Sequence, residues 1–265
     1  MAKNTTGDFY RELFALEGKV AVITGGTGVL CGAMGGTLHN AGCRIVLVGR
    51  KEEKANAHFA QWKSSPETAR FLKADVTEKH DLERIIPAVL DWFGAVNVWI
   101  NGAGVNSPTP YLEIADDEFN HIVSTNVLAV HRACQAIGAH WIKYKSKGSI
   151  INVTSMSAVR PLSRVFTYSL SKAAVLNLTQ NLAREWAPLG IRVNALCPGF
   201  FPAEQNLRFM TEERAAAIKA HTPMSRFGNA DELAGATLLL ASESAGSFIT
   251  GLNLIVDGGF SVTSI

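Results

Sequence analysis

The amino-acid sequence predicts one doubly wound α/β domain, a seven-stranded parallel sheet with helices on both faces. Apolar, β-branched runs of strand length alternate with segments of ten or more residues that have helical patterning. Such alternation requires right-handed crossovers, which place helices over both faces of a parallel sheet. The chain has 265 residues, 47% of them hydrophobic, which is enough for a substantial core in one large domain.

The elements follow in order after an expected N-terminal arm, residues 1–17, which precedes a single domain over residues 18–265. Strands are expected in the apolar runs 19–24, 44–48, 71–75, 96–101, 149–154, 191–196 and 252–256. Helices are expected over 28–41, 51–64, 78–93, 117–143, 167–186 and 229–242, several of them stopped by a glycine. Asn229 and Glu232 resemble a capping box for the last helix. Residues 200–224 are the irregular part, with a short helix near 212–220.

Composition narrows the class of protein. No apolar run approaches the roughly 18 residues of a membrane span, and the start of the chain does not have the pattern of a secretory signal. The four cysteines are scattered, which favours a reducing compartment, and we expect a cytoplasmic protein. A net charge of +2 gives no electrostatic case for nucleic acid, and the seven histidines do not have metal-ligand spacing.

A glycine-rich turn after the first strand predicts a nucleotide site. Residues 24–28 (TGGTG) follow a strand and open a helix, where backbone amides can hold a pyrophosphate. Ligands of such sheets bind at the carboxyl ends of the strands. After the second strand the chain has Arg50 instead of an acid, and Arg50 could pair with a 2′-phosphate. We therefore favour NADP(H), with NAD(H) possible; a ligand-free turn and a solvated Arg50 are the alternatives.

Tyr168 and Lys172 stand four residues apart in a predicted helix, on one face. An ammonium beside a phenol favours the phenolate, and bringing the pKa of tyrosine from about 10 to neutrality needs roughly 4 kcal/mol. Ser155 lies thirteen residues before Tyr168 and could face the same reacting oxygen. Taken alone, the Tyr–Lys pair fits a solvated helix surface better than a catalytic site.

Together the ordered motifs resemble the short-chain dehydrogenase/reductase family over residues 16–261. The resemblance implies a Rossmann-type fold and assigns cofactor contacts to Gly25, Thr27, Gly28, Val29, Leu30, Arg50, Asp75, Val76, Asn101, Ala103, Gly104, Tyr168, Lys172, Pro198, Gly199 and Phe201. It also implies a catalytic set of Asn126, Ser155, Tyr168 and Lys172, in which Tyr168 exchanges the proton at the substrate oxygen. Ser155 would bind that oxygen, Lys172 would lower the pKa of Tyr168 and hold the nicotinamide ribose, and Asn126 would help to hold a relay water.

The sequence departs from the family's pattern in the two turns that face the cofactor. Val29 and Cys31 stand where the compact branch has its second and third glycines, a spacing similar to that of the epimerase-type branch. Gly102 replaces the second asparagine of the family's N-N-A-G. Ala203 replaces a threonine that touches the carboxamide, so backbone groups near Phe200 and Phe201 are candidates for that contact. We expect a distorted but functional glycine turn.

The closest resemblance within the family is to sugar-acid reductases of the D-mannonate oxidoreductase (fructuronate reductase) type, carried by segments 198–206 and 222–228. A polar, anionic substrate would suit Asn106, Arg160, Arg164, Gln205 and Asn206, with Ser155 at the reacting oxygen. The arginines could equally be solvated or lie between subunits.

The expected function is thus NAD(P)(H)-dependent hydride transfer between nicotinamide and a secondary alcohol or ketone, on a polyol, sugar or sugar acid. The alternatives are a nucleotide-sugar epimerase or dehydratase, suggested by the glycine spacing alone, and a non-catalytic dinucleotide-binding protein. The family resemblance also implies a homo-oligomer, a dimer or homotetramer, built through the long helices and the C-terminal segment.

Overall fold

The computed structural model describes residues 6–202 and 210–263, and it contains the predicted seven-stranded parallel sheet. The strand order is β3-β2-β1-β4-β5-β6-β7. The strands are β1 (Val20–Thr24), β2 (Arg44–Gly49), β3 (Ala69–Lys73), β4 (Val98–Asn101), β5 (Gly148–Val153), β6 (Ile191–Pro198) and β7 (Asn253–Val256). All six neighbouring pairs are parallel, so the carboxyl ends of all seven strands lie on one side of the sheet.

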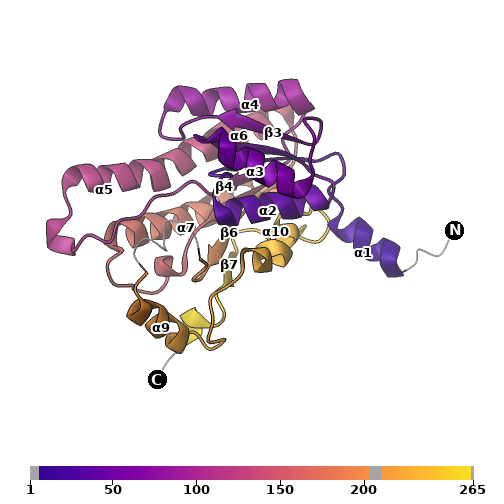
Figure 1. The fold of residues 1–265 in the computed structure, drawn as a ribbon. Helices are drawn as coiled ribbons and strands as arrows, with labels where there is room; N and C mark the ends of the chain where they lie inside the picture. The colour runs from indigo at the N-terminus through magenta and orange to yellow at the C-terminus, as the bar shows by residue number, and fades with distance from the viewer. Residues whose placement is uncertain (1–5, 203–209, 264–265) are drawn as a thin grey trace.

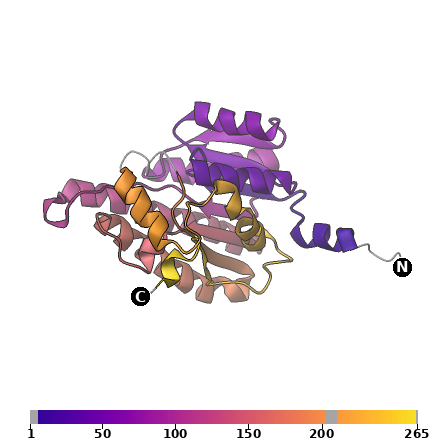
Figure 2. The ribbon, with the colours of Figure 1, turned by 60° about the horizontal axis from the view of Figure 1, so that its bottom comes forward.

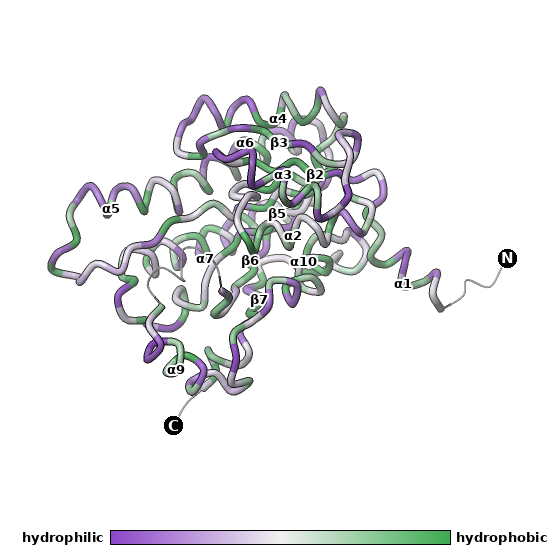
Figure 3. The backbone as a smooth tube through the Cα atoms, viewed as in Figure 1, coloured by the Kyte–Doolittle hydropathy of each residue, from purple (hydrophilic) through white to green (hydrophobic). Residues whose placement is uncertain are grey.

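Helices cover both faces of this sheet (Figure 1). The helices α2 (Val29–Asn40), α3 (Glu52–Trp62) and α10 (Ala234–Ala241) share one apolar core with one set of strand residues. The other core joins the opposite strand faces to α4 (Lys79–Phe93), α6 (Ala129–Tyr144) and α7 (Phe166–Trp186). Hydrophobic residues gather along the central strands and hydrophilic ones around them (Figure 3). The doubly wound prediction is confirmed.

Burial on both faces explains why the central strands are continuous apolar runs and do not alternate with polar residues. Every residue of β1 is buried, and so is Trp99 in β4. The Trp141 indole in α6 packs on Gly148, where a Cβ would lie 2.4 Å from the ring, and donates to the Val96 carbonyl at 2.7 Å. Close contact of this kind fixes α6 against the start of β5.

One expected helix differs from its prediction. The segment predicted as a helix over 117–143 consists of α5 (Asp116–Val123), a π-helical turn (Ser124–Leu128) and α6. The π turn carries the buried side chain of Asn126. A π turn re-aims side chains within an otherwise regular helix and is frequent at functional sites, a local feature that apolar periodicity does not encode.

The third strand ends two residues earlier than predicted, at Lys73, because its ladder with β2 stops where Lys73 pairs with Gly49. The short helix of the irregular part is α9 (Glu212–His221), and the capping box of Asn229 and Glu232 is present.

The helix α1 (Thr6–Phe14) stands away from the sheet in two views (Figures 1 and 2). No helix in the described part of the chain is both long and apolar enough to cross a membrane.

Candidate active site

The predicted site residues collect at the carboxyl ends of β1, β4 and β5, which are neighbours in the sheet. Strand order reverses between β1 and β4, since β2 and β3 lie on one side and β5 to β7 on the other. A crevice forms at such a switch point, because the connections leave it in opposite directions. The glycine turn follows β1, residues 102–105 follow β4, and Ser155 follows β5.

The glycine turn brings the backbone after β1 against the backbone after β4. Gly25 has a φ of 66°, and a Cβ there would lie 2.6 Å from the Ala103 nitrogen, so only glycine fits. Gly28 is the N-cap residue of α2 and has no side chain, so the first-turn N–H groups of α2 receive no acceptor from their N-cap residue. An anionic group such as a pyrophosphate suits this end of the helix.

Cys31 and Gly102 face each other across the same crevice. A Cβ on Gly102 would lie 2.1 Å from the Cys31 sulfur and 3.1 Å from the Thr24 carbonyl oxygen. The thiol is buried and its pKa is raised to about 11, chiefly by burial, so it is a neutral packing group at neutral pH. The side chain at position 31 therefore occupies the space that a side chain at position 102 would need. The two departures from the family's pattern compensate each other: a larger residue at position 31 is matched by a glycine at position 102.

Asn126 ties three segments together below the crevice. Its amide oxygen accepts from the Val105 N–H at 2.8 Å, and its amide nitrogen donates to the Val105 carbonyl and to the Ser171 hydroxyl, each at 2.9 Å. Ser171 in turn donates to the Tyr168 carbonyl at 2.7 Å. The Asn126 side chain thus holds the loop after β4 against α7, and the expected part of Asn126 in holding a relay water stays a prediction.

Ser155 and Tyr168 meet through their hydroxyls. Ser155 follows β5 and caps a short 3-10 turn, where its oxygen accepts from the Ser157 N–H at 3.2 Å and the Ser157 hydroxyl lies 3.1 Å away. Its side chain also hydrogen-bonds the phenol of Tyr168, a residue of the first turn of α7. Two hydroxyls from different elements thus converge on one point at the edge of the sheet.

Lys172 lies buried one helical turn after Tyr168. Its ammonium donates to the Val153 carbonyl at 2.8 Å and stands 5.5 Å from the centroid of the Tyr168 ring. Burial lowers the pKa of Lys172 to about 8, although the nearby Cys31 and Cys197 act in the opposite direction. A Cβ on Gly104 would lie 3.5 Å from this nitrogen, so the loop after β4 passes directly beside it.

The pKa of Tyr168 differs from the sequence-based expectation. Burial raises it, the hydrogen bond from Ser155 opposes that rise, and the nearby Cys197 raises it further. Together these influences leave the pKa of Tyr168 above its ordinary value in the protein without cofactor. The lowering predicted from the Tyr–Lys spacing alone is therefore not found in the chain by itself, in which Tyr168 is a neutral phenol at neutral pH.

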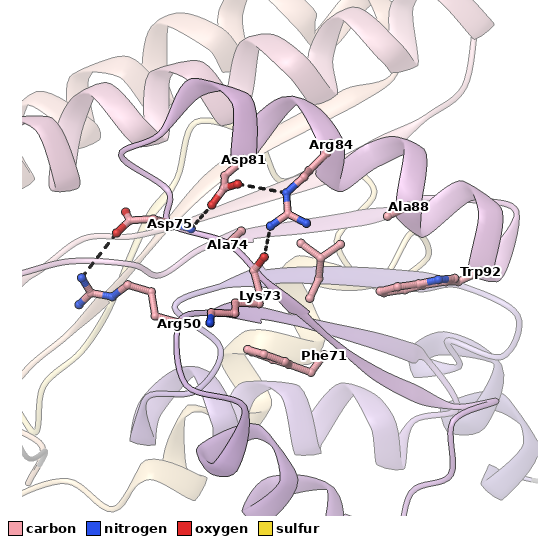
Figure 4. A pocket seen from close by; sticks show the side chains of 10 residues that line it. Arg50, Phe71, Lys73, Ala74, Asp75, Asp81, Arg84, Ala88 and Trp92 are labelled. Atoms are coloured by element: carbon pink, nitrogen blue, oxygen red, sulfur yellow. Dashed lines mark hydrogen bonds and ion pairs between the residues drawn. The ribbon is translucent and has the colours of Figure 1, made fainter.

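The opposite end of the crevice holds Arg50 and Asp75, which form an ion pair of 3.6 Å. They border a cavity of about 660 Å³ along the outer edge of β3, lined further by Phe71, Leu72, Lys73, Ala74, Asp81, Arg84, Ala88 and Trp92 (Figure 4). Val76, which follows Asp75 and was predicted with it as a cofactor contact, is buried in the apolar core. Arg50 directly follows the last residue of β2, and its side chain is exposed.

Several other predicted contacts are placed differently. Asn101 is buried and donates to the Asn152 side-chain oxygen at 2.8 Å, so its amide belongs to the core and only its backbone borders the crevice. The ring of Phe201 is buried and packs against Gly228, and the cofactor contact expected near Phe200 and Phe201 stays a prediction. Arg160 is exposed, yet its guanidinium donates to the Ser261 carbonyl at 2.7 Å.

The remaining predicted residues lie around the site or outside the described part. Asn106 is exposed on the loop after β4, Val29 is exposed at the start of α2, and Gly199 packs so closely on Asp257 that a Cβ would lie 2.6 Å from its Cα. Ala203, Gln205 and Asn206 lie outside the described residues.

Three residues that contribute to the site were not predicted from the sequence. Ser157 holds the Ser155 oxygen, Cys197 lies at the end of β6 near Tyr168 and Lys172, and Asp81 binds the backbone of Asp75. A serine two residues after Ser155 in SMS was the one visible signal for Ser157. The other two approach from distant elements, and their spacing in the chain carries no such signal.

The residues present fit a nicotinamide dinucleotide. The uncapped start of α2, with a turn whose glycines leave the backbone open, suits the pyrophosphate, and Arg50 stands where the adenosine ribose would lie. Lys172, Tyr168 and Ser155 stand at the other end of the same crevice. A dinucleotide site at the switch point beside a Ser–Tyr–Lys cluster defines a nicotinamide-dependent oxidoreductase.

Comparison with known proteins shows which family this chain is similar to. The family described as enoyl-(acyl carrier protein) reductase matches residues 30–261. An uncharacterised oxidoreductase, UxuB, from Bacillus subtilis is 39% identical over 92% of this chain and 95% of its own length. The gluconate 5-dehydrogenase of Gluconobacter oxydans is 31% identical over 95% of this chain and 98% of its own length. A crystal structure of a gluconate 5-dehydrogenase from Burkholderia cenocepacia, in complex with NADP and tartrate, superposes with a TM-score of 0.89 at 30% identity, covering 96% of this chain and 100% of that one.

The chain therefore belongs to the short-chain dehydrogenase/reductase family. It is an NAD(P)-dependent oxidoreductase that acts on alcohol and carbonyl groups.

The contact between Cys31 and Gly102 predicts strong coupling in a double-mutant cycle. We expect Gly102→Asn alone to lose about 2–3 kcal/mol in the free energy of unfolding, because the new side chain collides with the thiol. Combined with Cys31→Gly, the same substitution should cost at least about 1 kcal/mol less than the sum of the single variants. Urea unfolding of the four proteins measures this, and additivity within about 0.5 kcal/mol would contradict the coupling.

Proposed function

We propose that this enzyme interconverts a secondary hydroxyl and the corresponding ketone of a polar sugar acid, sugar or polyol, with NADP(H) as the favoured cofactor and NAD(H) as a possible one. The observation that carries the proposal is the convergence of Ser155, Tyr168 and Lys172 at the switch point, beside the glycine turn. Similarity to gluconate 5-dehydrogenases supports the substrate class. Segments 198–206 and 222–228 favour the D-mannonate oxidoreductase (fructuronate reductase) type within it.

Tyr168 is the proposed proton donor and acceptor at the substrate oxygen. A neutral phenol, as burial favours, is ready to donate when a carbonyl is reduced. The Ser155 hydroxyl, held by Ser157, would bind the same oxygen and orient it toward Tyr168. A nicotinamide bound here would supply or accept the hydride at the substrate carbon that carries this oxygen.

Lys172 is the proposed electrostatic partner of the reaction. Its buried ammonium stabilises negative charge that develops on the Tyr168 oxygen when the phenol gives up its proton. Binding of the nicotinamide ribose hydroxyls is its second proposed role, which its position beside the Gly104 loop supports. Asn126 contributes by fixing the Val105 loop and α7 relative to each other, which keeps Lys172 and Tyr168 in register.

An anionic substrate is supported by the charges around the site entrance. Arg160 and Arg164 lie on the loop between Ser155 and α7, and both are exposed. The bond from Arg160 to the Ser261 carbonyl ties this loop to the C-terminal segment, so that Arg160 is held near the site while its charge stays available. Asn106 on the loop after β4 is the proposed hydroxyl contact, with Gln205 proposed from the sequence alone.

A substrate panel tests the proposal directly. Initial rates with uronates, aldonates, polyols and steroid-like ketones, each with NADP(H) and NAD(H), should give turnover on the sugar acids or polyols. Activity on bulky apolar ketones alone would contradict the substrate class. The control is Tyr168→Phe, which should reduce turnover by orders of magnitude while the Kd of the cofactor changes less than about threefold, since only the proton-transfer group is lost.

The cofactor preference is supported by the absence of an acid at the end of β2 and by the exposed Arg50 guanidinium there. We expect kcat/KM to be higher with NADP(H) than with NAD(H), because Arg50 can bind a 2′-phosphate through two N–H groups. Steady-state kinetics with both cofactors measures this. A preference for NAD(H) greater than about tenfold would overturn the NADP assignment while leaving the reaction class intact.

A cytoplasmic homotetramer is the proposed state of the protein. The cysteines at 31, 43, 134 and 197 are buried free thiols, which suits a reducing compartment. Large apolar side chains are exposed on α5, α7 and the turn between α5 and α6, namely Phe119, Leu128, Phe166 and Leu170, which supports pairing through these helices. Phe248 and Val262 in the C-terminal part are exposed as well and support a second interface.

A further inference from the structure

The carboxylate of Asp75 stands beside the cation that the proposed function assigns to the cofactor. The Arg50 guanidinium and an Asp75 oxygen are 3.6 Å apart, and the side chain of Arg50 is 71% exposed against 34% for Asp75 (Figure 4). Arg50 therefore already has an anionic partner before any phosphate arrives. A 2′-phosphate that binds Arg50 must displace that carboxylate or share the guanidinium with it.

Asp75 is the fixed member of this pair. One of its oxygens accepts from the Thr77 N–H at 3.0 Å and from the Thr77 hydroxyl at 2.7 Å, and its other oxygen faces Arg50. These hydrogen bonds and the charge of Arg50 keep the pKa of Asp75 below its ordinary value, although partial burial acts in the opposite direction, so the carboxylate is charged at neutral pH. Among the described residues, Asp75 is the ion-pair partner of Arg50, and most of the Arg50 side chain is exposed to solvent.

The backbone of Asp75 is fixed as well, from the helix α4. Its N–H donates to an Asp81 carboxylate oxygen at 2.7 Å, and the other Asp81 oxygen binds Arg84 at 3.1 Å. Arg84 also donates to the Lys73 carbonyl on the outer edge of β3. The two side chains of α4 thus hold the end of β3, and the Asp75 charge stays where it is when Arg50 moves (Figure 4).

We propose that Asp75 is a specificity-determining residue, which weakens the preference for NADP(H) by competing for Arg50 and by placing a negative charge near the 2′-phosphate. The inference rests on the proposed role of Arg50 as the 2′-phosphate ligand. NAD(H), which lacks that phosphate, does not need Arg50 and loses nothing to the competition. The chain therefore discriminates less between the two cofactors than Arg50 alone would allow.

Equilibrium binding to the protein without substrate tests the inference. Calorimetric titration gives Kd values for NADPH and NADH, and for the half-molecules 2′,5′-ADP and 5′-AMP. Asp75→Asn should raise the ratio Kd(NADH)/Kd(NADPH) by about fivefold, the size expected for loss of one exposed ion pair together with a repulsion. Any contact of Asp75 with the common adenine changes both Kd values alike and cancels in the ratio. An unchanged ratio, or a lower one, overturns the inference.

Two further variants separate this inference from the proposed function. In the Arg50→Ala background, the effect of Asp75→Asn on the ratio should be smaller than in the parent protein, because no guanidinium is left to compete for and only the repulsion between Asp75 and the 2′-phosphate remains. The matched control is Asp91→Asn, which removes the same charge from the exposed face of α4 and should leave the ratio unchanged. If Arg50→Ala alone fails to lower the ratio, the role of Arg50 in the proposed function is wrong; if it lowers the ratio and Asp75→Asn has no effect, the inference about Asp75 alone is wrong.

Discussion

The burial of the Lys172 ammonium is the constraint on which the rest of the site depends. A charged amine is costly to bury unless it is hydrogen-bonded, and here the Val153 carbonyl at the end of β5 is the partner that meets part of this cost. Two neutral thiols, Cys31 and Cys197, complete its surroundings, and neither supplies a full counter-charge at neutral pH. The result is an amine whose pKa is lowered to about 8 and whose charge is poorly compensated. Negative charge on a neighbouring phenol or on a bound ligand would therefore be strongly favoured there.

The surrounding structure keeps that amine and its neighbours in place. Asn126, set in a π turn, binds both the loop after β4 and the helix that carries Lys172 and Tyr168. Behind it, Asn101 and Asn152 form a buried amide pair between β4 and β5, which fixes the strand ends from which the site is built. Fully satisfied buried polar networks of this kind select a single arrangement, since any displacement leaves an unpaired group. The reacting groups are consequently positioned by backbone and core contacts rather than by one another.

The sequence predicts the fold well because its signals are local. Apolar strand runs, glycine stops and the capping box at Asn229 each act within a few residues, and the parallel order follows from their alternation. Ser155, Tyr168 and Lys172 were also found, by spacing and family resemblance. The directions of side chains were harder to predict. The inward amide of Asn101 depends on Asn152, and the lowered pKa expected for Tyr168 is not found because burial of the phenol raises that pKa. The compensation between the thiol of Cys31 and the missing side chain of Gly102 is visible only in the structure, where the two turns are in contact.

The pKa of Lys172 in the cofactor-free protein is the most direct test of this account. Heteronuclear NMR of lysine side chains labelled with ¹³C and ¹⁵N, with the signal assigned by its loss in Lys172→Arg, should give a titration midpoint about 8. The folded protein would then bind fewer protons than the unfolded chain between about pH 8 and the ordinary lysine value, so this group adds stability as the pH rises through that range. A midpoint at or above the ordinary lysine value of 10.5 would contradict the account, because it would mean that the ammonium is solvated or already paired with an anion.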